Sequence, residues 1–270
     1  MISVKGEARL KVEGQEEVVF PNNVSDQVLT GLMNKIADQS YQYPDSLVPT
    51  RISLQSTSGL GWEFKDISSR SVATSGTLAY IDFYAIGFSP ATSANQPVQA
   101  YEIQLVSDTD TVATANMMSE EINPNPQIYA YQTVNISYRL ILSGGDVTWL
   151  ERLLAIIQGY PYMNSAQWVA DNSQFVEVNF GKLYYGSGLL ATSVFQMVVD
   201  SNQQQQFRVT VPDDVSFPQL NSSNIPDFIE YYCLGTGGEA QQVWTEAVSQ
   251  ISQFTSGSNL KVPFSISMTK

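Results

Sequence analysis

Residues 131–158, YQTVNISYRLILSGGDVTWLERLLAIIQ, bring together the two kinds of regular structure that the chain is expected to form. In the first half, apolar and polar side chains alternate, as they do in a strand with one buried face. Two glycines at 144–145 interrupt the alternation, and the apolar residues that follow recur at helical spacing. Asp146 is placed to cap this helix and Gly159 to end it. The stretch therefore predicts a strand, a turn and a helix.

Two further segments, 24–38 and 239–254, also have helical spacing. Asn23 or Ser25 is available to cap the first of them. The side chains expected on the buried faces are Val28, Leu29, Leu32, Met33 and Ile36 in the first helix, Val147, Leu150, Leu153, Leu154 and Ile157 in the helix after the glycines, and Val243, Ala247, Ile251 and Phe254 in the last.

Short β-branched or aromatic runs, separated by turn clusters, fill most of the remaining chain. The sequence thus predicts a mainly β protein with tandem β-sandwich-like units and a few helices packed on the sheets. Residues 1–145 would form a β-rich domain with a helix near 24–38, and residues 146–270 a second with helices near 146–158 and 239–254. The alternative is a single body in which all three helices cover the same sheets.

Composition limits the classes of partner. With 43% hydrophobic residues the chain can bury a core, and 13 basic against 26 acidic residues give a net charge of −13, which argues against nucleic-acid binding. Only 14% of residues are charged, so the surface is rich in uncharged polar groups that suit packing against protein. The one cysteine, Cys233, excludes an intrachain disulfide and is expected in a buried strand, and no apolar stretch reaches the ~18 residues of a membrane span.

Few residues suggest a catalytic, cofactor-binding or metal-binding role. The chain has no histidine, which excludes Ser-His-Asp devices and histidine metal sites, and it has no phosphate-binding glycine loop, so no cofactor is expected. The turn SDTDT offers Asp108 and Asp110 as oxygen ligands for calcium, although a capped hairpin turn is the simpler interpretation. Nominal carboxylate pairs for glycoside hydrolysis are Glu102 with Asp82, Glu120 with Glu121, and Asp213 with Asp214.

Tyrosines in or near loops are the candidate contact residues. Tyrosine combines an apolar ring with a polar tip, so it serves protein interfaces and stacks on sugars, although a core position is the commoner explanation for each strand aromatic. The candidates for an interface or for glycan stacking are Tyr41, Tyr43, Tyr160, Tyr162, Tyr184 and Tyr185.

The order of segments in residues 15–145 resembles that of β-rich, phage-type structural proteins of virus tails and tail fibres. The resemblance rests on the helix entry NNVSDQVLTGLMNKIA, the strand TRISLQSTSG, the segment YEIQLVSDTDTVATANM and the closing strand TVNISYRLILSGG. One feature departs from that pattern, because such proteins often carry an LGTG-like turn after the first helix, and here LGTGG stands at 234–238. The resemblance implies a virion component and assigns no catalytic residue.

The sequence therefore predicts a virion structural protein, of the tail, adaptor, fibre-base or capsid-associated kind, which works by protein assembly and is not an enzyme. Its expected partners are further copies of itself and other virion proteins, with no nucleic acid, no metal and no membrane span. One alternative is a host-attachment or carbohydrate-binding module that contacts a surface receptor or glycan through the tyrosines. A glycan depolymerase built on paired carboxylates is the other.

Overall fold

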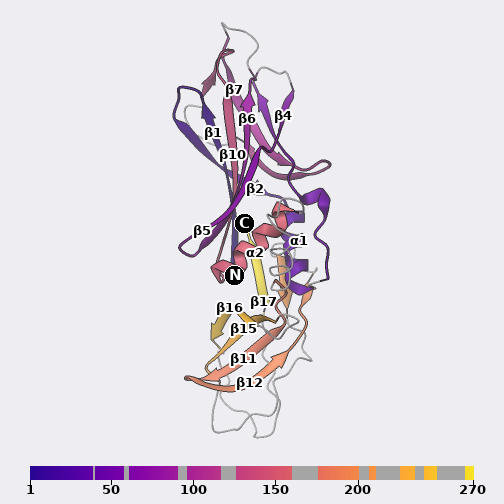
Figure 1. Ribbon diagram of the computed structural model, residues 1–270. Helices are drawn as coiled ribbons and strands as arrows, with labels where there is room; N and C mark the ends of the chain where they lie inside the picture. Colours follow the sequence, from indigo (N-terminus) through magenta and orange to yellow (C-terminus); the bar gives the residue numbers. More distant parts are fainter. Residues whose placement is uncertain are drawn as a thin grey trace.

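The computed structural model describes residues 1–38, 40–57, 61–90, 96–116, 126–159, 176–200, 207–210, 226–234, 240–247 and 265–270. These residues form two β-sheets, the α-helices α1 (Asp26–Ala37) and α2 (Val147–Gln158), and one short 3-10 helix, η1 (Asp45–Leu47). The mainly β fold with few helices is therefore confirmed. Figure 1 shows an elongated molecule with the larger sheet toward one end, the smaller sheet at the other, and α1 and α2 between them.

The larger sheet is built around β1, whose alternating sequence buries every second side chain. Along its whole length β1 pairs antiparallel with β10, and on its other side it pairs with β2 and with β17. The strands of this sheet are β1 (Ile2–Val12), β2 (Glu17–Val24), β3 (Arg51–Ser56), β4 (Trp62–Asp66), β5 (Ser69–Ser75), β6 (Leu78–Phe88), β7 (Val98–Val106), β8 (Thr111–Asn116), β9 (Gln127–Ile128), β10 (Val134–Ser143), β13 (Val198–Asp200), β14 (Phe207–Thr210) and β17 (Ser265–Thr269).

Three branches leave β1. The first runs through β10 and β6 to β5, the second through β2, β8, β7 and β3 to β4, and the third through β17 and β14 to β13. Because β4 also contacts β6, the second branch folds back over the first, and the two enclose apolar side chains in the manner of a β-sandwich. The sandwich-like character expected from the alternating runs is therefore present.

The smaller sheet has the strand order β12 (Gly188–Val194), β11 (Phe180–Tyr185), β15 (Phe228–Leu234) and β16 (Ala240–Ala247). Here the prediction of a helix near 239–254 is wrong, because 240–247 is strand β16. Val243 is buried as predicted, but it faces inward from a strand whose backbone pairs with β15 from Phe228 to Leu234. Pairing with a strand already in place outweighs local helical spacing. The rest of the predicted helix lies outside the described residues.

The two other predicted helices are confirmed with their caps. Ser25 caps α1 by accepting a hydrogen bond from the Val28 amide, and Asp146 caps α2 by accepting from two amides. Gly159 ends α2 with a positive φ of 78°, a conformation that glycine adopts without strain. The predicted face of α1 is buried throughout, and that of α2 is buried except for Val147, which is half-buried.

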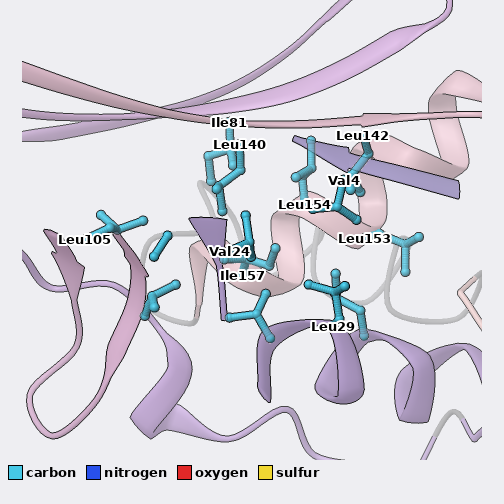
Figure 2. Packing of buried hydrophobic residues seen from close by; sticks show 14 of the residues in the cluster. Val4, Val24, Leu29, Ile81, Leu105, Leu140, Leu142, Leu153, Leu154 and Ile157 are labelled. Carbon is cyan, nitrogen blue, oxygen red and sulfur yellow. The ribbon is translucent and has the colours of Figure 1, made fainter. Parts of the chain in front are cut away.

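Helix α2 packs in the middle of the core. Its side chains Leu153, Leu154 and Ile157 lie between sheet residues such as Leu140 and Leu142 and the α1 residue Leu29 (Figure 2). This helix contacts β5, β6 and β10, so it covers strands that precede the glycine pair. A domain boundary at 145/146 would cut through this shared core. Among the described residues, no helix is both long and apolar enough to cross a membrane.

Candidate interaction surfaces

The smaller sheet has one buried face and one face toward the outside. Alternate residues of β15, such as Ile229, Tyr231 and Cys233, are buried in the core. The buried position predicted for Cys233 is therefore confirmed. The residues between them and their cross-strand neighbours on β11 point the other way. We call this set the aromatic face, and its members are Phe180, Lys182, Tyr184, Phe228, Glu230 and Tyr232. Tyr232 is buried at 8% exposure, and the other five are half-buried.

Cross-strand pairing arranges the aromatic face in three rows. Tyr184 lies opposite Phe228, and their rings stack with centroids 5.0 Å apart and planes 12° from parallel. At the other end Phe180 meets Tyr232 edge to face, with centroids 6.0 Å apart. Such cross-strand aromatic pairs stabilise a sheet directly. The aromatic face is therefore a rigid surface built by pairing strands about forty residues apart in sequence.

The middle row is charged and internally balanced. Lys182 lies opposite Glu230, with its Nζ 4.2 Å from the centroid of the Tyr232 ring. The Tyr232 hydroxyl donates a hydrogen bond to Glu230 Oε2 at 2.7 Å. Burial raises the pKa of the Tyr184 and Tyr232 phenols, and the Glu230 carboxylate raises both further. Both phenols therefore stay protonated near neutral pH and act as hydrogen-bond partners.

Strand β12 forms one edge of the smaller sheet among the described strands. Its sequence, GLLATSV, contains no charged residue and no proline, and Leu189 and Val194 are 54% and 66% exposed. An edge strand presents unpaired backbone groups on its outer side, and charged side chains usually protect it. The edge strand β4, with the sequence WEFKD, shows such protection. Edge β12 has no charged side chain of this kind, and no described strand pairs with its outer side.

The six candidate tyrosines do not gather at one site. Tyr184 belongs to the aromatic face, whereas its neighbour Tyr185 is 49% exposed and lies on the opposite side of the strand. Tyr41 and Tyr43 lie after α1, and the Tyr43 ring packs against Gly31, which leaves no room for a Cβ there. Burial strongly raises the pKa of Tyr43. The remaining two, Tyr160 and Tyr162, lie outside the described residues.

Sequence reasoning missed the other aromatic residues of this surface. Phe180, Phe228 and Tyr232 each appear in a strand-like run, FGKLYY or FIEYYCL, where a core position is the usual expectation. The signal that could have revealed them is the matching alternation of the two runs. Pairing places their outward positions in register, and only the register shows that they form one surface.

The carboxylate candidates have structural partners where they are described. Asp82 is buried and accepts two hydrogen bonds from Arg139, from Nε at 2.6 Å and from Nη2 at 2.7 Å. Glu102 lies on β7, which does not pair with the strand of Asp82, and it accepts a hydrogen bond from Gln104. The vicinal pairs at 120–121 and 213–214 lie outside the described residues.

The SDTDT segment forms the turn between β7 and β8. Asp108 accepts a hydrogen bond from the Thr50 hydroxyl, and the Asp110 backbone is bonded to Ser107 in both directions. These contacts are those of a capped hairpin turn. In the part of the chain that the structure describes, no group of three or more histidine, cysteine or acidic residues is placed to hold a metal ion.

A cavity of about 570 Å³ lies beside the turn that joins β10 to α2. The glycines at 144–145 and Asp146 line one side, and residues 242–245 of β16 line another. Asp146 Oδ1 already accepts hydrogen bonds from the Thr148 and Trp149 amides and from Gln241 Nε2. The carboxylate in the described lining therefore serves the helix and its contact with β16.

Comparisons with protein-family models, with curated proteins and with solved structures find no match for the chain, and none of them indicates a viral origin. The aromatic face and edge β12 are thus the observations that bear most directly on function.

Proposed function

We propose that the protein is a structural subunit that works by binding other protein, through the aromatic face and edge β12, and that a virion is the setting of this assembly. The observation that carries the proposal is the aromatic face, which concentrates four aromatic rings on the outer side of a small sheet. Tyrosine and phenylalanine are enriched in protein interfaces, and tyrosine is one of the residues enriched among the few that carry most of the binding energy.

The orientation of the rings favours a protein partner over a sugar. Tyr184 and Phe228 stack face to face across the strands, so each ring covers one face of the other. Their cross-strand neighbours are Leu189 and Ala247, and both aromatic residues are half-buried. Stacking on a sugar requires an open ring face, whereas a protein surface packs well against ring edges and hydroxyl groups.

Edge β12 adds a second mode of contact beside the first. As an edge among the described strands, β12 can accept a strand from another molecule, and Leu189 and Val194 would supply apolar contact area. A stable interface of this kind buries at least ~1,000 Å² in total. Because the strand is uncharged, two copies of a chain with a net charge of −13 meet there with little repulsion.

The virion setting rests on the sequence pattern of residues 15–145, which resembles that of tail and fibre proteins. Such a subunit would bind further copies of itself or neighbouring virion proteins. Its role as a tail, adaptor, fibre-base or capsid-associated component follows from the same pattern.

The test is self-association measured by analytical ultracentrifugation, together with capture of candidate virion proteins expressed alongside the chain. The double variant Tyr184→Ala/Phe228→Ala should weaken association at least tenfold, or about 1.4 kcal/mol. The matched control is Tyr131→Ala, which removes a more exposed tyrosine elsewhere and should leave association unchanged. A protein that stays monomeric at high concentration and captures no virion partner would remove the support for assembly.

A further inference from the structure

A stacked pair of tyrosines lies outside the aromatic face, in the short turn between β9 and β10. The rings of Tyr129 and Tyr131 stack with centroids 5.7 Å apart and planes 17° from parallel. Tyr129 is half-buried, but Tyr131 is 74% exposed, the highest value among the described large hydrophobic side chains. One face of the Tyr131 ring is covered by its partner and the rest is open to a ligand.

Hydrogen bonds hold this turn in place. Gln132 accepts from the Tyr129 amide through Oε1 at 3.0 Å and donates to the Glu13 carbonyl through Nε2 at 2.8 Å. Gln15 donates to the Gln127 carbonyl at 2.6 Å, which ties the strand before the turn to the β1–β2 hairpin. A ring held in this way loses little freedom on binding, which lowers the cost of association.

A cavity of about 430 Å³ lies beside Tyr129, the residue that stacks on Tyr131. Its described lining combines the apolar residues Val18, Pro126 and Tyr129 with the glutamines at 15, 99 and 127. The volume falls within the usual range of about 300–1,000 Å³ for small-ligand sites. A primary amide both donates and accepts hydrogen bonds, which is the capacity that neighbouring sugar hydroxyls require.

The charge of the cavity limits the ligand further. Glu16 belongs to the described lining, whereas no lysine or arginine does, and the whole chain carries a net charge of −13. An acidic saccharide would therefore be repelled. We propose that this site binds a neutral glycan, with the apolar face of a sugar ring on Tyr131 and its hydroxyls bonded to the glutamine amides.

This site is independent of the aromatic face, and it differs in the feature that matters for sugars. Tyr131 is 74% exposed, whereas Tyr184 and Phe228 are half-buried. A glycan site would give the chain a surface-attachment role in addition to assembly. None of the six tyrosines predicted from the sequence belongs to it.

The experiment is an array of linear neutral oligosaccharides (cellohexaose, maltohexaose and laminarihexaose) beside acidic ones, followed by titration calorimetry with the best binder. We expect a neutral glycan to bind with a Kd of about 1 mM or below. Tyr131→Ala should weaken binding at least tenfold, whereas Tyr131→Phe should retain it because the ring remains. Tyr185→Ala, which removes an exposed tyrosine from the smaller sheet, is the matched control and should bind as the wild type does.

Three results would overturn the proposal: no neutral oligosaccharide binds, only acidic ones bind, or Tyr131→Ala binds as tightly as the wild type. Thermal unfolding of each variant identifies any loss of fold. Self-association of the same proteins is measured in parallel. The variant Tyr184→Ala/Phe228→Ala should lose self-association and keep glycan binding, whereas Tyr131→Ala should keep self-association and lose glycan binding.

Discussion

Removing the Arg139 guanidinium should destabilise the protein by about 2–3 kcal/mol, because it leaves a buried carboxylate without its partner. The Asp82 side chain is 5% exposed and that of Arg139 is 21% exposed, and two short charge-assisted hydrogen bonds join them. The guanidinium also lies 4.0 Å from the centroid of the Tyr80 ring. Removing one partner of a fully buried ion pair lowers the free energy of unfolding by about 3–5 kcal/mol. Because Arg139 is partly exposed, we expect a smaller loss here.

The measurement is equilibrium unfolding in urea of Arg139→Met, Asp82→Asn and the double variant, combined in a double-mutant cycle. Methionine keeps an unbranched stem over Tyr80, so the cycle reports mainly on the charges. We expect a coupling energy of about 2 kcal/mol. Arg9→Met is the matched control, since its pair with Glu7 is about one third exposed on both sides and should contribute below about 1 kcal/mol.

A coupling energy below about 0.5 kcal/mol would refute the assignment of Asp82 to a structural ion pair. The result also bears on the enzymatic alternative. A carboxylate that serves hydrolysis can be changed to the amide with loss of activity and little loss of stability, whereas a structural one cannot.

Four further variants or conditions test other features of the fold. Asp146→Ala should lower the free energy of unfolding in urea by about 1 kcal/mol, and Asp146→Asn by much less, because asparagine also caps helices. Gly159→Ala should lower the free energy of unfolding by about 2 kcal/mol or more, because φ is positive and a buried side chain occupies the space of the new Cβ. Gly14→Ala, with φ of 79° and open space around it, measures the backbone strain alone. Equal losses of stability in the two variants would contradict this reasoning. Cys233, whose pKa is raised by burial, should resist thiol reagents until urea unfolds the chain. Burial also raises the pKa of Tyr231 in the folded chain, so the phenol of the unfolded chain ionises at lower pH. The free energy of unfolding should therefore fall as pH rises above about 10. The measurement is tyrosine ionisation, which should coincide with unfolding.

Local signals explain what the sequence predicted well. The helices α1 and α2 each carry a capping residue and an apolar face at helical spacing, and α2 is also followed by the glycine that ends it. The alternation in β1 and β10 likewise gave the mainly β class. These features depend on neighbours in sequence, and so they survive in the folded chain.

The features that the sequence did not predict depend on contacts between distant segments of the chain. Residues 240–247 carry a helical pattern, yet they form a strand because they pair with β15. Nothing in the local sequence of 240–247 indicates that pairing. The aromatic face requires the register between β11 and β15, and the Tyr131 turn is fixed by side chains from the β1–β2 hairpin. In each case the contact joins segments far apart in the chain.

The position of β1 has a consequence for the order in which the chain folds. This first strand pairs with β10 more than a hundred residues later and, through residues Ile2 and Ser3, with β17 near the end. A ribosome that adds about 5–20 residues per second delivers β17 on the order of tens of seconds after β1. Contacts of such long range also slow folding. During synthesis β1 is thus a strand whose apolar face is exposed until its partners are made, and chaperones that hold nascent chains should stay in contact with this segment.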